Sequence, residues 1–385
     1  MQTKHLTFAA LLSCITTLSY AEYQIGDVGA IAFGLDASVL TTDNVTMDSS
    51  EDSDNILSVL PTVNFKSDAG AASIEAYVGV EMISYDDLSE NDSDDFKSNL
   101  KVTFPDELNG ENYSLVFDGG YNEFTRAIAN ADGAGRVVST DVVDLALDGR
   151  YYISEDITLR TGVELLNQES NTTGYADVDT TTIPVAVFYD LDEALSVGLG
   201  YRNRSTEVGN QVTVAGAKSD SEDHIFFIGL ENETSDIWSY ALEIGFQQRD
   251  FDSATYSDQD GLFASLNVNW QVSEMTELAA ELSNEYATAL SNESADIARA
   301  AVQLNHTFDE RISAALGLSY EEIDYTAANG TRDDETFSSF LSVDYRLLDG
   351  RWILRGTVSY DDNSSDAASA NYTALRGGIS SIFVF

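Results

Sequence analysis

The sequence has little of three residue types on which many folds depend. Its 385 residues include one cysteine, three prolines and three histidines. A single cysteine excludes disulfide bonds within the chain as a source of stability, and so few histidines leave no pair at metal-binding spacing. Long apolar runs are also lacking, because no stretch after the N-terminus has the roughly 20 apolar residues that a membrane-spanning helix needs.

Basic residues are scarce as well. The chain has 19 Lys and Arg against 66 Asp and Glu, which gives a formal net charge of −47. Such a chain repels phosphate backbones, so nucleic acid is excluded as a partner. Aromatic residues make up 10% of the chain, too many for an acidic disordered protein. There is no G-x-S-x-G motif, and His224 and His306 are the only histidines after the N-terminal segment, so we predict neither an enzyme nor a bound cofactor.

The first 21 residues are typical of a secretory signal peptide. Lys4 and His5 begin it, an apolar centre follows, and Ser19-Tyr20-Ala21 ends it with small residues. We predict cleavage before Glu22, which leaves residues 22–385 as one domain without cysteine. The segment before Cys14 also resembles a lipoprotein cleavage box, but its apolar run is short.

What the sequence has in abundance is alternation. In "SIEAYVGVEMISYDD", from Ser73 to Asp87, apolar side chains occupy every second position and glutamate, tyrosine or glycine lies between them. A period of two indicates a β-strand with one apolar and one polar face. The pattern recurs in "ITLRTGVEL", "YALEIGFQ", "ISAALGLSY" and "WILRGTVSY".

The connections between these segments alternate in length. Short ones, such as "SED" from Ser154, are followed by long acidic and polar ones, such as "TTDNVTMDSSEDSDN" from Thr41 and the segment from Arg202 to Asp223. An aromatic residue precedes a tight acidic turn in each unit of a weak repeat, at Tyr152, Tyr189, Trp270, Phe308 and Tyr345. These hairpin-sized units predict about eighteen strands, with sixteen as the alternative.

The predicted strands are too long for an ordinary soluble sheet. Many have ten or more residues, against the usual ~5–6, whereas a transmembrane strand needs ~9–11. Only a closed barrel leaves no unpaired backbone facing lipid. Aromatic residues at strand ends suit the two girdles of a membrane barrel, and those predicted there are Tyr85, Tyr121, Tyr151, Tyr152, Tyr189, Tyr201, Trp270, Tyr320, Tyr345 and Tyr360. We therefore predict an all-β fold, a transmembrane antiparallel up-and-down β-barrel in the outer membrane of a Gram-negative bacterium. Its turns would be short and periplasmic, and its long acidic loops extracellular.

The chain ends in "GGISSIFVF". This resembles the C-terminal strand of outer-membrane proteins, where a final phenylalanine is the signal for the barrel-assembly machinery. Ile379 and Phe383 share the face of Phe385, although Gly377 and Ser381 make the match partial. Phe385 is therefore the predicted assembly signal. That machinery, outer-membrane lipid and lipopolysaccharide are the predicted partners.

The polar face of each strand would line a water-filled lumen. Most of the scarce basic residues fall on this face, so their guanidinium groups could form a path for anionic or hydroxyl-rich solutes. The alternative is that arginines and acids pair across neighbouring strands and brace the wall. The predicted lumen-facing residues are Glu75, Glu81, Lys97, Lys101, Arg150, Arg160, Glu164, Arg202, Glu243, Arg249, Arg299, Arg346, Arg355 and Arg376.

The acidic loops also have two interpretations. Clustered carboxylates are oxygen ligands for divalent cations, which would cross-bridge the loops to lipopolysaccharide; alternatively, the loops are simply solvated. "SSEDSDN" and "SENDSDD" lack the glycine and the terminal glutamate of an EF-hand loop. We therefore assign no metal site.

The regular hairpins resemble the putative beta-barrel porin type 2 family. The resemblance rests on units such as "YYISEDITLRTGVEL" and on strand ends such as "ISYDD", "QQRDFD" and "YEEIDY", and it covers roughly residues 35–385. The family implies an outer-membrane barrel often encoded with exopolysaccharide systems, and hence partners in polysaccharide secretion. It supplies no functional residues.

These observations favour a porin-like channel for the passage or export of hydrophilic solutes related to exopolysaccharide. Two other functions remain open from the sequence: a structural or adhesive surface barrel whose acidic loops bind divalent cations, and a general nutrient porin.

Overall fold

The computed structural model describes residues 23–25, 29–68, 72–104, 112–127, 136–192, 194–209, 217–232, 237–327 and 330–384. The predicted signal peptide with Cys14 and the predicted assembly signal Phe385 lie outside these residues. No helix in the described part of the chain is long and apolar enough to cross a membrane.

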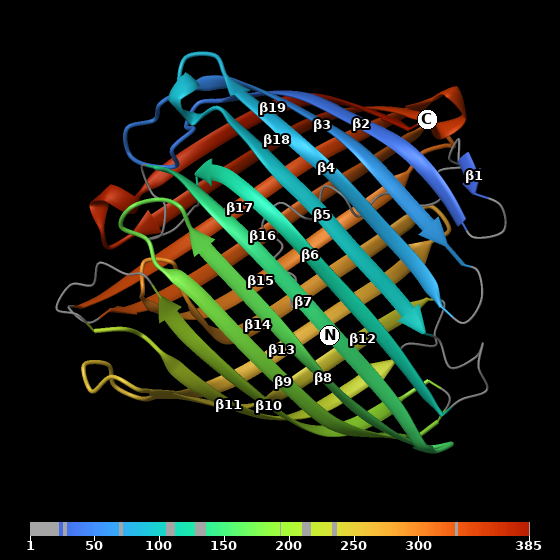
Figure 1. Cartoon of the computed structure of the whole chain (residues 1–385), viewed down its shortest axis with the longest axis vertical. Coiled ribbons are helices and arrows are strands. Elements are labelled where there is room, and N and C mark those ends of the chain that lie inside the picture. The colour runs from blue at the N-terminus through green and yellow to red at the C-terminus, as the bar shows by residue number, and fades with distance from the viewer. Residues whose placement is uncertain are drawn as a thin grey trace.

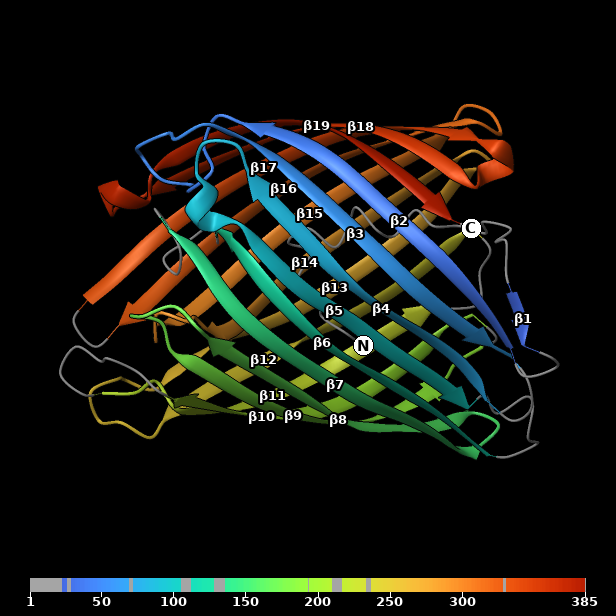
Figure 2. The same ribbon diagram turned by 45° about the horizontal axis from the view of Figure 1, so that its top comes forward.

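Long strands make up nearly all of the described chain (Figures 1 and 2). A three-residue strand, β1 (Tyr23–Ile25), comes first, and 3-10 turns occur at η2 (Ser89–Asn91), η4 (Leu348–Gly350) and η5 (Ala368–Ala370). The others are β2 (Gly29–Thr42), β3 (Asp54–Ser67), β4 (Ser73–Tyr85), β5 (Ser93–Phe104), β6 (Tyr113–Ala127), β7 (Val137–Ser154), β8 (Ile157–Ser170), β9 (Asp177–Asp190), β10 (Ser196–Gly209), β11 (Ser221–Asn232), β12 (Trp238–Phe251), β13 (Gln259–Ser273), β14 (Thr276–Thr288), β15 (Ser294–Thr307), β16 (Ile312–Ala327), β17 (Gly330–Leu347), β18 (Trp352–Ser365) and β19 (Tyr372–Val384).

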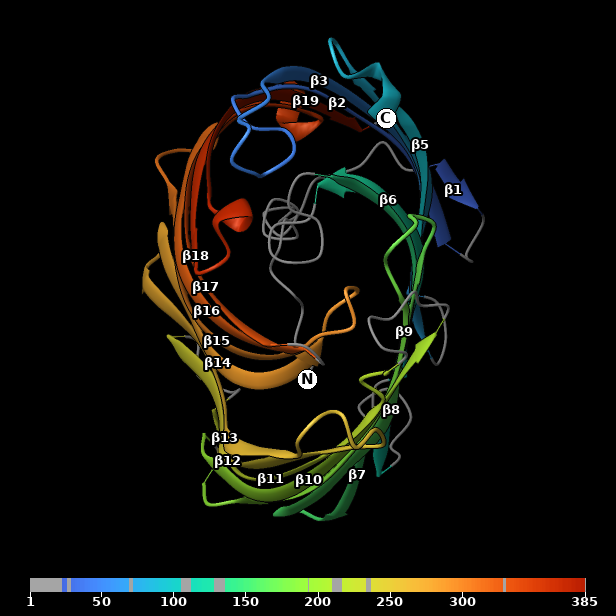
Figure 3. The ribbon, with the colours of Figure 1, turned by 90° about the vertical axis from the view of Figure 1, so that its left-hand side faces the viewer.

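The strands β2–β19 form one closed antiparallel barrel. Each pairs with the strand that follows it in sequence, and β19 pairs with β2 to close the ring, with Arg376 opposite Thr42 and Val384 opposite Gly34. β1 pairs only with the start of β2. The prediction of about eighteen strands in an up-and-down barrel is confirmed. Seen along the barrel from one end, the outline is elongated rather than round (Figure 3).

The two ends of the barrel differ. Connections such as 155–156 and 274–275 gather at the end where β2 begins and β19 finishes, which we call the turn end. Connections such as 43–53 and 252–258 gather at the opposite end, the loop end. The acidic loops are shorter than predicted, because ladder pairing continues into them: β10 reaches Gly209 and β11 begins at Ser221. Both ends of the segment predicted as one loop from Arg202 to Asp223 are therefore strand.

One face of the wall is apolar and exposed. On β4, Val78, Val80 and Met82 are 41%, 39% and 44% exposed. They alternate with Gly79 and Glu81, whose side of the strand is the other face. Large apolar side chains are rarely left in water in such a continuous surface. Because a closed barrel has no unpaired edge, this surface suits contact with lipid acyl chains.

Aromatic residues form two belts on this outward face. Tyr113 and Tyr121 are eight residues apart on β6, and Phe337 and Tyr345 are eight apart on β17. Eight residues span about 26 Å along a strand, or about 20 Å vertically at the usual tilt, which is close to the ~25 Å apolar band of membrane barrels. Trp238 and Trp270 stack in the belt nearer the turn end, which we call the lower belt, with ring centroids 4.7 Å apart.

Four of the tyrosines predicted at strand ends lie near the middle of their strands instead. They are Tyr121, Tyr201, Tyr320 and Tyr360. The strands continue beyond the belt nearer the loop end. Past that belt the outward face becomes acidic, at positions such as Glu123 and Asp141. Two other predicted belt residues, Tyr85 and Tyr152, are on the opposite face, because their ladder partners Ile56 and Thr158 are there.

The outward face can be tested on two adjacent residues of β2. Val39 is 51% exposed on the apolar face, between the two belts, and Ser38 is on the polar face. Val39→Arg should lower the free energy of unfolding by about 2–4 kcal/mol, the cost of an arginine at the bilayer midplane. Ser38→Arg should change it by less than about 1 kcal/mol, since Asp36 lies two residues away on the same face.

The measurement is guanidinium unfolding of each variant from lipid vesicles, followed by tryptophan fluorescence. If the two arginines cost the same, the apolar face does not meet lipid.

Candidate functional site

The sheet register places all fourteen predicted lumen-facing residues on one face. Paired residues of an antiparallel ladder have their side chains on the same side. Glu75 is opposite Lys101, Lys101 is opposite Asp118, and the pairing continues around the ring. We call this the inner face. The role of these residues in solute passage stays a prediction.

Contacts between distant strands show that this face is the concave one. Nη1 of Arg160 on β8 is 2.6 Å from Oε2 of Glu231 on β11. Nη2 of Arg204 on β10 is 2.8 Å from Oε2 of Glu285 on β14. Because these strands are three and four places apart in the sheet, their side chains can meet only across the interior.

Most arginines of the inner face are paired with carboxylates. Nε and Nη2 of Arg355 donate to the two oxygens of Asp344, its ladder partner, at 2.6 and 2.7 Å. Arg376 is paired with Asp361. The bidentate contact of Arg355 with Asp344 fixes both of those side chains. For these residues, the interpretation of the arginines as braces of the wall fits the structure better than that of free solute donors.

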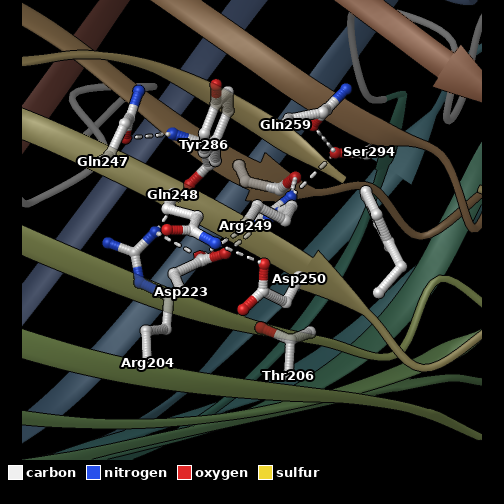
Figure 4. A network of polar contacts seen from close by, with 12 residues as sticks. Arg204, Thr206, Asp223, Gln247, Gln248, Arg249, Asp250, Gln259, Tyr286 and Ser294 are labelled. Carbon is white, nitrogen blue, oxygen red and sulfur yellow. Dashed lines mark hydrogen bonds and ion pairs between the residues drawn. The ribbon is translucent and has the colours of Figure 1, made fainter. Parts of the chain in front are cut away.

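Arg249 is at the centre of a buried network (Figure 4). It is 0% exposed, and its Nε and Nη2 donate to the two oxygens of Asp223 at 2.7 Å each. Its Nη1 donates to the carbonyl of Ala287 at 2.6 Å and to Oγ of Ser294 at 2.9 Å. A single side chain therefore joins β11, β12, β14 and β15.

The space enclosed by β8–β14, which we call the smaller compartment, is packed. Its apolar side chains form one cluster of buried residues: Ala186, Phe188, Ile225, Phe227 and Phe263. The ring of Phe227 lies so close to Gly200 that an added Cβ would come within 2.1 Å of it. Only glycine permits that approach. Of the predicted lumen residues, the smaller compartment holds Arg160, Glu164, Arg202, Glu243 and Arg249.

The remaining interior, bounded by β15–β19 and β2–β7, we call the larger compartment. It holds Glu75, Glu81, Lys97, Lys101, Arg150, Arg299, Arg346, Arg355 and Arg376. Its inner wall also presents uncharged polar rows. Ser38, Ser58 and Ser380 are ladder neighbours on β2, β3 and β19, and each is only partly buried.

The end of β6 turns into the larger compartment (Figure 3). Pairing of β5 with β6 stops at Lys97 opposite Asn122, although both strands continue toward the loop end. Side chains satisfy the freed backbone there, since the Phe96 N–H donates to Oε2 of Glu123 at 2.8 Å and the Thr125 N–H to Oδ2 of Asp95 at 2.8 Å. Lys97 donates to the carbonyl of Glu123. The inward turn leaves charged groups inside the larger compartment.

Sequence reasoning missed Tyr77. Among the described strands β2–β19, Tyr77 is the one large exposed apolar side chain on the inner face, at 38% exposed. Its ladder neighbours are Asn64 and Asn99, and Asn99 donates to Oδ1 of Asp118 at 2.7 Å. An aromatic ring on the otherwise polar face of this strand is an exception to the alternation. That exception was the signal in the sequence that could have singled out Tyr77.

Two polar features lie away from the inner face. His224 and His306 are on outward-facing positions, where they contact the hydroxyls of Tyr201 and Thr276 at 2.7 and 2.9 Å.

Asp48 lies in the loop 43–53. Burial would raise the pKa of its carboxyl, but hydrogen bonds from Ser50 and Thr46 outweigh burial and lower that pKa. In the part of the chain that the structure describes, no three His, Cys, Asp or Glu are grouped to hold a metal ion.

Comparison with known proteins supports the porin resemblance. The family model described as "Putative beta-barrel porin 2" matches residues 189–381, just over half of the chain. The chain belongs to this porin family. A search of curated protein sequences gives no match.

The porin also has solved structural relatives with the same barrel fold. Pseudomonas aeruginosa OpdO superposes with a TM-score of 0.51 at 11% identity, covering 93% of this chain and 98% of that one. Pseudomonas aeruginosa OccK2 (OpdF) has a TM-score of 0.50 at 11% identity, with 92% and 98% covered. At this identity the likeness concerns the fold alone.

Proposed function

We propose that the protein is an outer-membrane channel for hydrophilic solutes, and that these are hydroxyl-rich molecules related to exopolysaccharide. The observation that carries the proposal is the closed ring of β2–β19 with an apolar outer face and an ionisable inner face. Barrels of 16–18 strands are wide enough to hold an aqueous channel. Membership of a porin family favours a channel over an enzyme.

Uncharged polar groups support the choice of hydroxyl-rich solutes. Because most arginines of the wall are paired with carboxylates that offset their charge, they attract anions weakly, and the net charge of −47 repels anions further. Asn64, Asn99 and the serine row offer neutral donors and acceptors for sugar hydroxyls. The exposed ring of Tyr77 between the two asparagines offers a flat apolar surface for a sugar ring.

The proposed setting follows from the two ends of the barrel. With an even strand count both termini would be periplasmic, so the loop end would face outward into the lipopolysaccharide layer. The assembly machinery would act on the C-terminal strand, and polysaccharide-secretion components would meet the turn end. The aromatic belts, the short connections at the turn end and membership of the porin family support this proposed orientation.

The test is planar-bilayer recording of the purified, folded protein. We expect stepwise currents that a hydroxyl-rich oligosaccharide blocks in a concentration-dependent way. Tyr77→Ala should raise the half-blocking concentration by about fivefold, equivalent to about 1 kcal/mol for the lost ring contact. Tyr320→Ala, which removes an outward-facing tyrosine that is 43% exposed, should leave the block unchanged.

A folded barrel that passes no current at any voltage would remove the channel proposal. Currents that no oligosaccharide blocks, with neutral sugars passing at rates set by size alone, would instead identify a general nutrient porin.

A further inference from the structure

The end of the β14–β15 hairpin leaves the barrel wall. Pairing of β13 with β14 stops at Ala264 opposite Asn284, although β13 begins at Gln259 and β14 continues to Thr288. β14 stays paired with β15 up to Thr288 opposite Ser294. The two strands therefore separate from β13 together, and the connection 289–293 is carried away from the wall.

This connection binds three other connections of the loop end. The carbonyl of Leu290 accepts a hydrogen bond from the Ala176 N–H at 2.7 Å. The side chain of Asn292 accepts from the Ser219 N–H at 2.8 Å and donates to the Ala217 carbonyl at 3.0 Å. The Tyr256 hydroxyl donates to the Asn292 carbonyl at 2.9 Å. The turn thus covers the loop end of the smaller compartment.

Side chains of the smaller compartment satisfy the backbone edge that β13 leaves free. The Tyr286 N–H donates to Oε1 of Gln247 at 3.2 Å, and the Tyr286 carbonyl accepts from Nη1 of Arg204 at 2.6 Å (Figure 4). Gln247 is 1% exposed. An unpaired buried backbone group is costly, so these bonds hold the hairpin end in its inward position.

Below this polar layer, buried side chains fill the middle of the smaller compartment. Ile225, Phe227 and Phe263 occupy the middle, at 1%, 5% and 1% exposed. Toward the turn end, the guanidinium of Arg160 lies 4.2 Å from the ring centroid of Phe188 and is paired with Glu231. No solute-sized space is compatible with side chains so fully excluded from solvent.

We infer that solutes cross only through the larger compartment, and that its inner side chains alone determine which solutes pass. The inference rests on the proposed channel function. It assigns selectivity to residues such as Glu75, Glu81 and Lys101, and it removes Arg202 and Arg249 from the candidates. The half of the inner face that carries Arg202, Arg204 and Arg249 is a packed core that holds one side of the barrel shut.

Single cysteines provide the test, because the mature chain predicted to begin at Glu22 contains none. Ser38→Cys places a thiol on the larger compartment's wall. Thr182→Cys places one on the inner face of β9, where the native side chain is 5% exposed. Each folded variant is treated with a charged methanethiosulfonate reagent, and labelling is followed by mass and by bilayer current.

The Ser38→Cys thiol should label quickly and its current should fall. The Thr182→Cys thiol should label roughly 100-fold or more slowly until the protein is unfolded, since a buried group reacts only through local opening. Ala186→Cys, a small change in the buried cluster, serves if Thr182→Cys does not fold.

Equal labelling rates in both compartments would overturn the inference, and so would a fall in current when the Thr182→Cys or Ala186→Cys variant is labelled. If the wild-type protein carries no current, the proposed function fails, and the ratio of labelling rates still decides between one open compartment and two.

Discussion

Replacing Arg249 by methionine is expected to lower the free energy of unfolding by about 3–5 kcal/mol, the usual cost of breaking a buried ion pair from one side. Asp223 is 1% exposed and would keep its charge with only Nη1 of Arg204, 3.8 Å away, as a cationic neighbour. The Ala287 carbonyl and the Ser294 hydroxyl would each lose a donor. Guanidinium unfolding from lipid vesicles, followed by tryptophan fluorescence, measures the change.

Two further variants show whether the buried charge is the cause. Arg311→Met removes an exposed arginine in the turn 308–311 and should change stability by less than about 0.5 kcal/mol. Arg249→Met combined with Asp223→Leu removes both charges and should recover part of the loss, because apolar replacements of a buried pair are often tolerated. If Arg249→Met is as stable as the wild type, the network does not hold β14 and β15 in place.

The second large effect is expected for Phe227→Ala, at about 3–5 kcal/mol, the range for removing a buried aromatic ring. Phe227 is 5% exposed, and its ring centroid lies 6.1 Å from that of Phe263. Its removal leaves a cavity between Phe263 and the bare backbone at Gly200, which rigid ladder pairing prevents from collapsing.

The adjacent residue supplies a matched control. Phe226 is on the same strand with its side chain on the outward face, 58% exposed. Phe226→Ala removes the same number of atoms but leaves no internal cavity, so its cost should be under about 1.5 kcal/mol. Comparable losses for the two variants, measured by the same unfolding assay, would mean that the smaller compartment is not a packed core.

Much of the wall could be predicted from the sequence because strand alternation is a local property. The period of two assigns a face to each side chain before any partner strand is known. Glu75 and Lys101 were placed on the same face in this way, and the ladder sets them opposite each other. The strand count followed from counting turns, which also depends on neighbouring residues only.

Strand ends were predicted less well. The acidic segment from Arg202 to Asp223 has the composition of a loop, yet residues up to Gly209 and from Ser221 pair in the ladder. Backbone pairing with a neighbouring strand outweighs weak local propensity there. For the same reason, Tyr201 and Tyr320 lie near the middle of their strands rather than at the predicted strand ends.

By itself the sequence determined that the chain forms a barrel of long antiparallel strands, which of its side chains share a face, and that its few basic residues are on the polar one. Only the tertiary structure decided that Arg160 meets Glu231, that the β14–β15 hairpin crosses to Ala176, and that Tyr77 is exposed inside. The reason is physical: a face is fixed by the backbone of one strand, whereas contacts across the interior depend on how the closed sheet curves and on where its ladders end.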